Sequence, residues 1–413
     1  MGRGMIPPAE ALELVIGHTP TLGLERVPLS RGVERILAED LSARDCLPPF
    51  DNSAMDGYAV RAEDLKDASP QRPVELTVRE IVRAGVASRF ELQPGEAARI
   101  MTGAPLPRGA DSVVMQELTA PGAQGRVRMA RTAEAGSHIR ARGEDVLAGS
   151  LLLKKGAILR PYEIALLAAQ GIAEVPVIRR PRVAVLATGD ELVAHEQSLS
   201  EGKIRNSNGP AILAALSRWG IPTVDLGIVR DAPEEIRSAL APALSQADVI
   251  IVTGGVSVGD FDYTQAVFSE IGIREVFWKV AIKPGKPLLF GIHETPGTPR
   301  KLVFGLPGNP IAALVCLEEF VRPALEKLQG RALKHQSYHL AGRAMNDYPK
   351  PKDRQQYLFC RAEPGPNGYE LSILRPQGSA LLGMASSANA LAVAPIGIAR
   401  VPQGATLPFR WLK

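Results

Sequence analysis

Features that would narrow the class of this protein are scarce in its sequence. The 413 residues include three cysteines, Cys46, Cys316 and Cys360, which are widely separated and form no CxxC pair. This argues against a disulfide framework and against a zinc site. No apolar run approaches the roughly 20 residues of a membrane-spanning helix. The opening Met-Gly-Arg-Gly-Met-Ile-Pro-Pro also lacks the apolar centre of a secretory signal. We therefore expect a cytoplasmic protein that does not enter a membrane.

A strong charge of one sign is missing as well. Lysine and arginine number 48 against 44 aspartates and glutamates, a net charge of +4. No long basic run interleaved with aromatic residues occurs, so nucleic acid is not an expected partner. The balance is compatible with a small anionic ligand bound at one place.

The segment from about 181 to 325 alternates between apolar strand patterns and helical patterns. This order predicts an α/β domain with a mostly parallel sheet covered on both faces. Asp231-Ala-Pro-Glu234 has the form of a capping box that opens a helix ending near Ser245. The other predicted strands are 182–188, 223–229, 248–253 and 301–305, and the other helices are 209–219, 263–271 and 310–328.

The flanking segments have different patterns. Val33, Ile36, Leu37 and Leu41 form one apolar stripe at helical spacing, and Leu151 to Gly171 also has a helical pattern with Pro161 at a favourable first position. Short alternating runs such as 74–78 predict a small β domain within 51–145. After about 333, short strands separated by turns predict a β barrel or sandwich.

Three loops that leave predicted strands have the composition of a binding site. They are Thr188-Gly-Asp-Glu-Leu192, Thr253-Gly-Gly-Val-Ser-Val-Gly259 and Gly305-Leu-Pro-Gly-Asn-Pro310. Ligands of open α/β sheets bind beyond the carboxyl ends of the strands, and glycines let backbone N–H groups approach a phosphate.

Carboxylates follow two of these loops. Asp260 and Asp262 would repel a phosphate unless a cation lies between, and Mg²⁺ held by one or two carboxylates and phosphate oxygens resolves the conflict. Asp190 and Glu191 could bind the same ion. The alternative is that these residues form turns and helix caps.

Lys279, Lys283 and Lys286 place three ammonium groups in eight residues. If 279–283 is extended, the first two share a face, and Pro284-Gly285 turns the chain so that Lys286 converges on them. Such lysines suit a multiply charged oxyanion. A solvated edge strand remains the alternative.

Eight segments in order resemble the molybdopterin molybdenumtransferase family, the MoeA type related to the gephyrin E-domain. The segments are FDNSAMDGYAV, RIMTGAPLPRGADSVVMQE, IRARGEDVLAGS, LATGDEL, IVTGGVSVGDFDYT, FWKVAIKPGKP, FGLPGNPIAAL and QGSALLGMASSANALAVAP. They cover nearly the whole chain.

The resemblance implies a multidomain α/β plus β fold. It divides the chain into a discontinuous elongated helical domain (1–50 and 145–180), an inserted β domain (51–144), a three-layer α/β domain (181–328) and a C-terminal β barrel (333–413). It also implies a homodimer in which the inserted domain of one copy completes the active site of the other. The adenylyltransferase of the preceding step and the recipient molybdoenzymes are expected as transient partners.

The activity implied is insertion of molybdate into adenylylated molybdopterin with release of AMP, in a Mg²⁺-dependent step. On matching positions, catalytic roles fall to Asp56, Thr102, Asp145, Glu191, Asp231 and Asp262, and the metal would be held by Glu191, Asp262 and Asp190. Substrate would be bound by Thr253, Gly254, Gly255, Ser257, Gly259, Lys279, Lys283, Lys286, Pro307, Gly308, Asn309, Arg354 and Ser379.

Arg354 departs from the family pattern, because this chain has Pro351-Lys-Asp-Arg354 where the family often has a Pro-Gly-Arg turn. Asp231 also suits the helix cap described above. Two other functions remain open: adenylylation of molybdopterin by ATP, which uses a related α/β domain, and a scaffold that binds the pterin without turnover.

Overall fold

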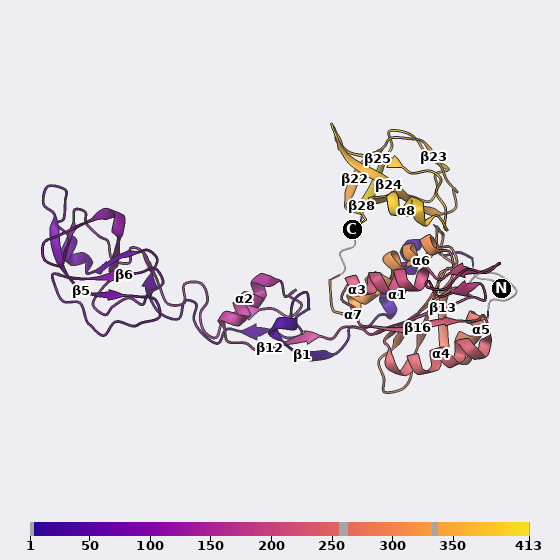
Figure 1. The fold of residues 1–413 in the computed structure, drawn as a ribbon, viewed down its shortest axis with the longest axis horizontal. Coiled ribbons are helices and arrows are strands. Elements are labelled where there is room, and N and C mark those ends of the chain that lie inside the picture. The colour runs from indigo at the N-terminus through magenta and orange to yellow at the C-terminus, as the bar shows by residue number, and fades with distance from the viewer. Residues whose placement is uncertain (1–3, 256–262, 333–337, 413) are drawn as a thin grey trace. The chain divides into compact units, whose positions relative to one another are not determined.

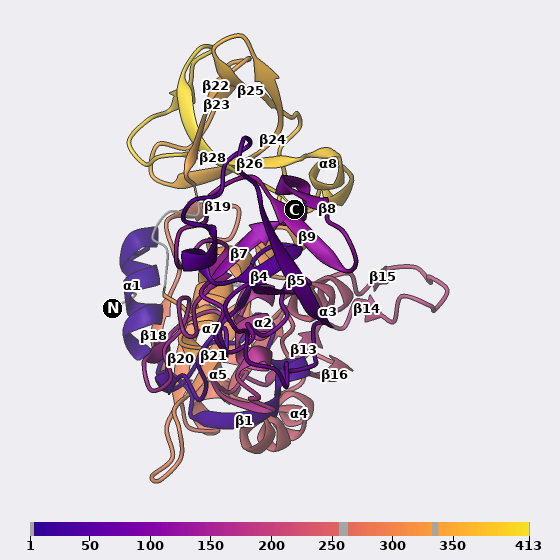
Figure 2. The same cartoon turned by 90° about the vertical axis from the view of Figure 1, so that its left-hand side faces the viewer.

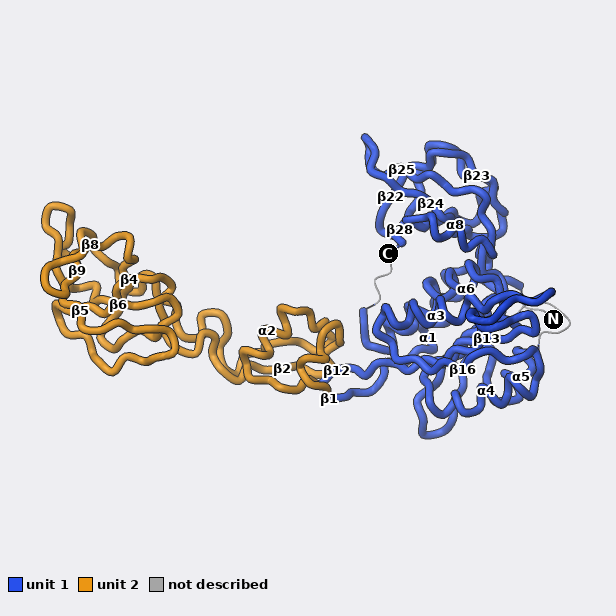
Figure 3. Tube along the Cα trace, in the orientation of Figure 1, with its two compact units in different colours: residues 1–26, 176–413 blue, residues 27–175 orange. Residues whose placement is uncertain are grey.

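The computed structural model describes residues 4–255, 263–332 and 338–412. The chain divides into two compact units, residues 1–26 with 176–413 and residues 27–175 (Figure 3). None of the helices in the described part of the chain is long and apolar enough to cross a bilayer.

The first unit contains an α/β domain built on one mixed sheet (Figure 1). Its strands are β13 (Val183–Thr188), β16 (Thr223–Val229), β17 (Val249–Thr253), β18 (Ile273–Trp278), β20 (Leu289–His293) and β21 (Lys301–Leu306). The order across the sheet is β16-β13-β17-β21-β20-β18. The first four are parallel, and β20 runs antiparallel to both of its neighbours. The carboxyl ends of β16, β13, β17 and β21 therefore lie along one edge.

Helices cover both faces of this sheet (Figure 1). They are α1 (Pro8–His18), α3 (Asn208–Arg218), α4 (Pro233–Gln246), α5 (Thr264–Glu270), α6 (Pro310–Cys316) and α7 (Arg322–Leu328). On one face, Ile236 of α4 and Val267 of α5 share a buried cluster with Leu186 and Val252 of the sheet. On the other face, α3 contacts α6. Burial on both faces explains why the central strands are continuous apolar runs.

The predicted parallel strands and helices of this domain are confirmed within one or two residues. The antiparallel pair β18 and β20 was not predicted. The lysine-rich segment 279–286 separates the two strands, and it drew attention to a binding role rather than to strand pairing. The single predicted helix 310–328 is interrupted by a π-turn, Leu317–Val321, between α6 and α7. Two short strands, β14 (Leu192–Val193) and β15 (Ile204–Arg205), pair with each other beyond β13.

The last part of the first unit is a closed barrel, so the prediction of a barrel or sandwich resolves to a barrel. Among the described residues five strands close the ring in the order β24-β25-β22-β28-β26, and β26 returns to β24 (Figure 2). Leu358, Cys360, Leu371 and Phe409 fill its interior. The barrel strands are β22 (Leu340–Ala344), β24 (Gln355–Gly365), β25 (Gly368–Ile373), β26 (Ala390–Ala394) and β28 (Thr406–Trp411), with β23 (Tyr348–Pro349), β27 (Arg400–Val401) and α8 (Leu382–Ser387) attached.

The barrel and the α/β domain are joined by backbone pairing. The short strand β19 (Ile282–Lys283) leaves the α/β domain and pairs in parallel with β24, with Lys283 opposite Gln356. The lysine turn that follows β19 is thereby fixed to the barrel wall.

The second unit contains a sheet of order β7-β4-β6-β5-β9-β8, with buried clusters that include Leu76 and Ala59. Its strands are β4 (Gly57–Val60), β5 (Val74–Val82), β6 (Glu96–Ile100), β7 (Ser112–Met115), β8 (Thr119–Pro121) and β9 (Arg126–Met129). The strand expected at 74–78 is confirmed as part of β5. Smaller elements are β2 (Leu41–Ser42), β3 (Asn52–Ser53), β10 (Ile139–Arg140), β11 (Leu151–Leu153), α2 (Pro161–Ala169) and the 3₁₀ turns 29–31, 62–65 and 116–118, while β1 (Leu24–Pro28) pairs with β12 (Glu174–Ile178).

Two helical predictions in this unit are wrong. The stripe at 33–41 forms no helix; Ile36 makes an isolated bridge with Ile158 and Leu41 begins β2. The helix expected from Leu151 begins only at Pro161, and Leu151–Leu153 is β11. In both cases the apolar residues pair, as β structure, with a segment more than one hundred residues away in the sequence.

Candidate active site

The glycine loop after β17 packs tightly against the end of β13. Gly254 and Gly255 have φ angles of +96° and +58°. A Cβ on Gly254 would lie 2.1 Å from the carbonyl oxygen of Thr188, and one on Gly255 would lie 2.3 Å from Oγ1 of Thr264. Only glycine fits at either position, because both the conformation and the space exclude a side chain. These glycines are therefore needed for close packing against Thr188 and Thr264, whatever ligand the loop binds. The sequence alone did not reveal this structural requirement.

The later part of this loop, with Ser257, Gly259, Asp260 and Asp262, lies outside the described residues. The binding and metal roles expected of these residues stay predictions.

The three loops predicted to carry a ligand meet at one cavity of about 600 Å³. Thr188 and Glu191 of the first loop, Thr253 of the second and Pro307 and Asn309 of the third line it. Gly254, Gly255 and Gly308 also contribute. We call this space the edge cavity.

Asn208, which sequence reasoning did not select, ties two of these loops together. Its side chain is buried at 8% exposure, and Nδ2 donates to Oγ1 of Thr253 at 2.7 Å and to the carbonyl of Gly308 at 2.9 Å. Oδ1 is buried without a hydrogen-bond partner among the described residues. An asparagine opening an apolar helix pattern was the available signal, but it suggests a local cap rather than these distant contacts.

Asp231 is not the helix cap that the sequence suggested. The N-cap of α4 is Ala232, without a side-chain capping bond. The Asp231 carboxylate instead accepts a hydrogen bond from the Thr188 hydroxyl and lines the edge cavity with Glu191. Asp231 thus makes a hydrogen bond to a residue at the end of the neighbouring strand, β13, instead of capping the helix that follows it.

Asp190 and Glu191 are adjacent in the sequence but line different cavities. Glu191 lines the edge cavity, whereas Asp190 lines a neighbouring hollow of about 890 Å³, and its carbonyl accepts from the Lys203 ammonium. Glu191 and Asp231 are therefore the described carboxylates that line the edge cavity. Among the described residues no group of three or more His, Cys, Asp or Glu side chains is placed to hold a metal ion.

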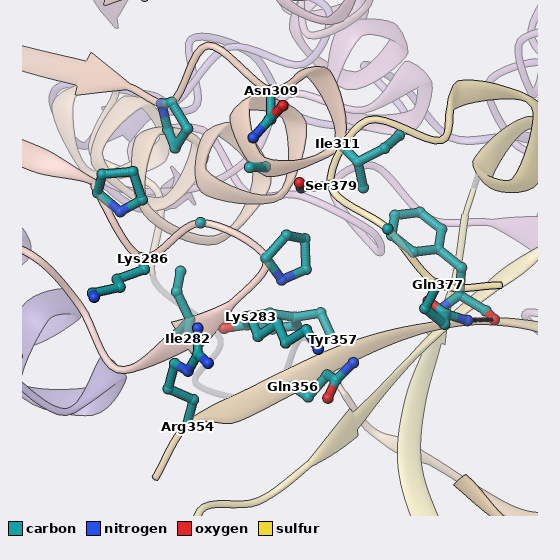
Figure 4. Close-up of a pocket in the computed structure, with 17 residues that line it drawn as sticks. Ile282, Lys283, Lys286, Asn309, Ile311, Arg354, Gln356, Tyr357, Gln377 and Ser379 are labelled. Carbon is teal, nitrogen blue, oxygen red and sulfur yellow. Dashed lines mark hydrogen bonds between the residues drawn. The ribbon is translucent and has the colours of Figure 1, made fainter. Parts of the chain in front are cut away.

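A second cavity, of about 240 Å³, is lined by cations from two domains (Figure 4). Lys283 ends β19 and Lys286 lies in the turn that follows, whereas Arg354 and Ser379 come from the barrel. Nε of Arg354 is buried without a hydrogen-bond partner among the described residues, and it forms only a long ion pair with Asp353, whose Oδ1 is 3.6 Å away. We call this space the oxyanion cavity, since three cations and a hydroxyl suit a tetrahedral dianion.

Lys279 does not join these groups, and the extended conformation considered for 279–283 is wrong. Lys279 has a φ of +76°, which breaks the strand after Trp278. Its ammonium lies 3.7 Å from the centre of the Trp278 ring, a cation–π contact. Its N–H donates to the carbonyl of Leu288.

The two cavities adjoin each other. Pro287, Pro307 and Asn309 line both. Asn309 is the N-cap of α6 but makes no side-chain capping bond, so its amide is not used locally. A ligand with a phosphate in the edge cavity could thus lie next to an oxyanion held by the lysines and Arg354.

Asp56 and Thr102 lie together in the second unit. Oδ1 of Asp56 accepts from the Thr102 N–H and from its hydroxyl, each at 2.7 Å. The backbone hydrogen bond first, and then the hydroxyl, lower the pKa of the Asp56 carboxyl, so that it stays ionised. Asp145 is exposed in the same unit, and its N–H donates to the carbonyl of Leu47 at 3.0 Å.

Models of three protein families match consecutive parts of the chain. Residues 6–171 match the MoeA N-terminal region (domain I and II), residues 184–327 a probable molybdopterin binding domain, and residues 341–410 the MoeA C-terminal region (domain IV).

Known proteins resemble the chain over most of its length. The molybdopterin molybdenumtransferase of a Nostoc species is 39% identical over 372 residues, 90% of this chain and 84% of the relative. That of Bacillus subtilis is 38% identical over 361 residues, 86% and 82% of the two chains. The crystal structure of a molybdopterin biosynthesis MoeA protein from Pyrococcus horikoshii superimposes with a TM-score of 0.82 at 33% identity, covering 99% of each chain.

Proposed function

The chain belongs to the molybdopterin molybdenumtransferase family, and on that premise we propose that its two adjoining cavities are the site at which molybdate is inserted into adenylylated molybdopterin. It is an enzyme of molybdenum cofactor biosynthesis. The observation that carries the proposal is the shared wall between a cavity lined by Lys283, Lys286 and Arg354 and one lined by strand-end loops.

The oxyanion cavity would hold molybdate. Lys283, Lys286 and Arg354 offset its two negative charges, and the hydroxyl of Ser379 adds a neutral donor. Asn309, on the common wall, would orient the oxyanion towards the second substrate. This arrangement needs no nucleophilic side chain, since the dithiolene sulfurs that attack molybdenum belong to the pterin.

The edge cavity would hold the phosphate end of adenylylated molybdopterin, on backbone groups of Thr253, Gly254, Gly255 and Gly308. Asn208 keeps these loops together, and its free Oδ1 could accept from a ligand N–H. Ser257 and Gly259 are assigned to the same phosphate by their place in the loop.

Magnesium fits this site. Mg²⁺ is commonly held by one or two carboxylates together with phosphate oxygens, and Glu191 and Asp231 line the same cavity. We assign these two, with Asp262, to the ion. Bound there, Mg²⁺ would neutralise charge on the phosphoanhydride as AMP leaves. The Thr188 hydroxyl orients Asp231.

We further propose a cytoplasmic homodimer in which Asp56, Thr102 and Asp145 of a second copy complete the site. The ionised Asp56 carboxylate, held by two donors from Thr102, supports a role in substrate contact. The division into domains at 1–50 with 145–180, 51–144, 181–328 and 333–413 is part of this proposal, as are transient contacts with an adenylyltransferase and with recipient molybdoenzymes.

The purified chain should release AMP from adenylylated molybdopterin in the presence of molybdate and Mg²⁺. Consumption of ATP with unadenylylated pterin would instead favour an adenylyltransferase. Pterin binding without turnover would favour a scaffold.

A further inference from the structure

A buried carboxylate, Glu319, connects the α/β domain to the barrel behind the oxyanion cavity. It lies in the π-turn Leu317–Val321 that follows α6, and its side chain is 12% exposed. Its Oε1 accepts from the Tyr338 hydroxyl at 2.8 Å and from Nη2 of Arg410 at 3.2 Å. Arg410 belongs to β28 of the barrel and is 13% exposed. The carboxylate therefore binds groups on the barrel side from a helix on the α/β side.

The charges of this cluster compensate each other. Burial raises the pKa of the Glu319 carboxyl, and the Arg410 charge opposes that rise. Glu318 lies 3.5 Å from the same guanidinium, but it is more exposed and also pairs with Arg322. Because Arg410 balances Glu319, the buried carboxylate need not repel an anion in the neighbouring cavity.

The end of α6, directly before the π-turn that carries Glu319, is in contact with the lysine turn. Cys316 immediately precedes the π-turn, and its buried thiol donates to the carbonyl of Gly285 at 3.5 Å. Gly285 stands between the cavity residues Lys283 and Lys286, and a Cβ there would lie 2.7 Å from Sγ of Cys316. The lysine wall of the cavity thus rests on the end of α6.

The same cluster reaches the barrel wall. The ring of Tyr338 lies 6.3 Å from that of Tyr357, and Tyr357 lines the oxyanion cavity (Figure 4). Tyr357 is on β24, which begins directly after Arg354. Glu319 itself does not line the cavity, so it cannot act by contact with the anion.

The cavity requires its two walls to be at a fixed separation. Lys283 and Lys286 come from one domain, and Arg354 and Ser379 come from the other. A tetrahedral oxyanion contacts both sets only if their donors are held to within a fraction of an ångström.

We propose that Glu319 is a positioning residue for the oxyanion cavity. By binding Arg410 and Tyr338 it fixes the barrel against α6, and so holds Arg354 and Ser379 at the separation from the lysines at which one dianion contacts both walls. This inference rests on the proposed function of the cavity as the molybdate site.

Glu319→Ala tests the inference by titration of the full-length protein with molybdate in a calorimeter, beside steady-state AMP release. We expect the molybdate Kd and KM to rise about tenfold or more, while kcat at saturating molybdate and the KM for adenylylated molybdopterin change less than about twofold. A residue with a merely structural role would lower the active fraction, so that kcat falls and both KM values stay unchanged.

A double-mutant cycle tests the route of action. In an Arg354→Ala background, Glu319→Ala should weaken molybdate binding several-fold less than it does in the wild-type background, since Arg354, the charged group that it positions, is gone and only Ser379 remains. Fully additive effects of the two changes would overturn the inference.

Glu326→Ala is the matched control, because Glu326 lies on the following helix, is 35% exposed and pairs with Arg322 rather than with the barrel. It should leave the molybdate Kd unchanged. If Glu319→Ala fails to fold, Tyr338→Phe removes one donor to the carboxylate with little change in volume, and a molybdate Kd equal to wild type would then overturn the inference.

Failure of the proposed function and failure of the positioning role give different results. If the wild-type protein binds no molybdate, the proposed function fails. If wild type binds molybdate and Glu319→Ala binds it equally well, the positioning role alone fails.

Discussion

Arg354 is the residue that most directly links the sequence of this chain to its oxyanion cavity. The turn Pro351-Lys-Asp-Arg354 departs from the family pattern, yet Arg354 lines the same cavity as Lys283 and Ser379. Its buried Nε has no hydrogen-bond partner among the described residues. A buried donor without a partner is costly, and an oxyanion would satisfy it.

Replacing Arg354 should therefore weaken molybdate binding selectively. Arg354→Ala and Lys283→Ala should each raise the molybdate KM at least about tenfold, equivalent to about 1.4 kcal/mol, with a smaller effect on the KM for adenylylated molybdopterin. Steady-state AMP release at varied molybdate measures both constants. Lys352→Ala, an exposed neighbour outside the cavity, is the control. A change in the pterin KM alone would contradict the assignment of these residues to molybdate, and kinetics equal to wild type would favour the solvated surface alternative.

Asp248 shows how a single carboxylate stabilises the sheet at the end away from the cavities. It precedes β17 and accepts from both terminal nitrogens of Arg179, at 2.7 and 2.6 Å, and from the N–H of Arg182 at 2.8 Å. Burial alone would raise the pKa of the Asp248 carboxyl, but these hydrogen bonds and the Arg179 charge outweigh it and lower that pKa.

The stability that Asp248 contributes should depend on pH with a defined sign. Because the pKa is lowered on folding, the contribution is complete above the ordinary aspartate value near 3.8 and is lost as pH falls through the lower value of the folded state. Asp248→Asn should reduce the free energy of unfolding by about 1–3 kcal/mol at pH 7, and the difference from wild type should narrow below about pH 4.

Denaturant unfolding at pH 7 and pH 3.5 measures this difference. Glu363→Gln, which removes an exposed partner of Arg361, should change the free energy of unfolding by less than about 0.5 kcal/mol. A difference between Asp248→Asn and wild type that is the same at both pH values would contradict the account.

At the scale of elements, the edge cavity depends on the close approach of two strand ends. Gly254→Ala places a Cβ against the carbonyl of Thr188 and should destabilise the protein by about 2–4 kcal/mol. Because the loop must move, the KM for adenylylated molybdopterin should rise as well.

Gly272→Ala is the matched control for backbone strain. Gly272 has a φ of +80°, close to that of Gly254, but the nearest atom to a Cβ there, on His293, is 3.7 Å away. It should lower the free energy of unfolding by about 1–2 kcal/mol and leave both KM values unchanged. Equal effects of the two substitutions on the pterin KM would show that the contact with Thr188 is unimportant.

The elements that could be predicted from the sequence are those set by local pattern. The buried parallel strands β13, β17 and β21 are continuous apolar runs, and the helices between them have clear periodicity, so both were predicted. The wrong predictions concern residues whose contacts lie far away in the sequence. Ile36 pairs with Ile158, and Asp231 accepts a hydrogen bond from Thr188 instead of capping α4.

For the candidate site, the sequence likewise predicted the position of the loops but not the contacts between distant residues. Strand-end loops could be assigned to one sheet edge by topology alone, and the edge cavity bears this out. The divergence of Asp190 from Glu191 and the positive φ of Lys279 depend on tertiary packing. Asn208 joins Thr253 and Gly308, which lie 45 and 100 positions away, and no sequence periodicity signals such a contact.

At the scale of the whole molecule, the proposed homodimer places residues of two copies in each active site. If Asp56 of one copy and Lys283 of the other serve the same site, a heterodimer of Asp56→Asn and Lys283→Ala has one intact site and one doubly altered site. The assay uses molybdate well below the wild-type KM, where each variant alone is expected to release little AMP. Refolding the two variants together in equal amounts should then restore about a quarter of the wild-type AMP release, as expected for random pairing of symmetric dimers. Activity that stays at the level of the separate variants would contradict the shared site.

The central claim, that adjoining cavities bring molybdate to adenylylated molybdopterin, is tested most directly in a single turnover. Enzyme preloaded with adenylylated molybdopterin and Mg²⁺ is mixed with molybdate, and AMP and pterin-bound molybdenum are both quantified. The account predicts one molybdenum bound per AMP released, little AMP without molybdate, and a shift of the molybdate dependence to higher concentration in Arg354→Ala. AMP release that is independent of molybdate, or none above the magnesium-free control, would contradict it.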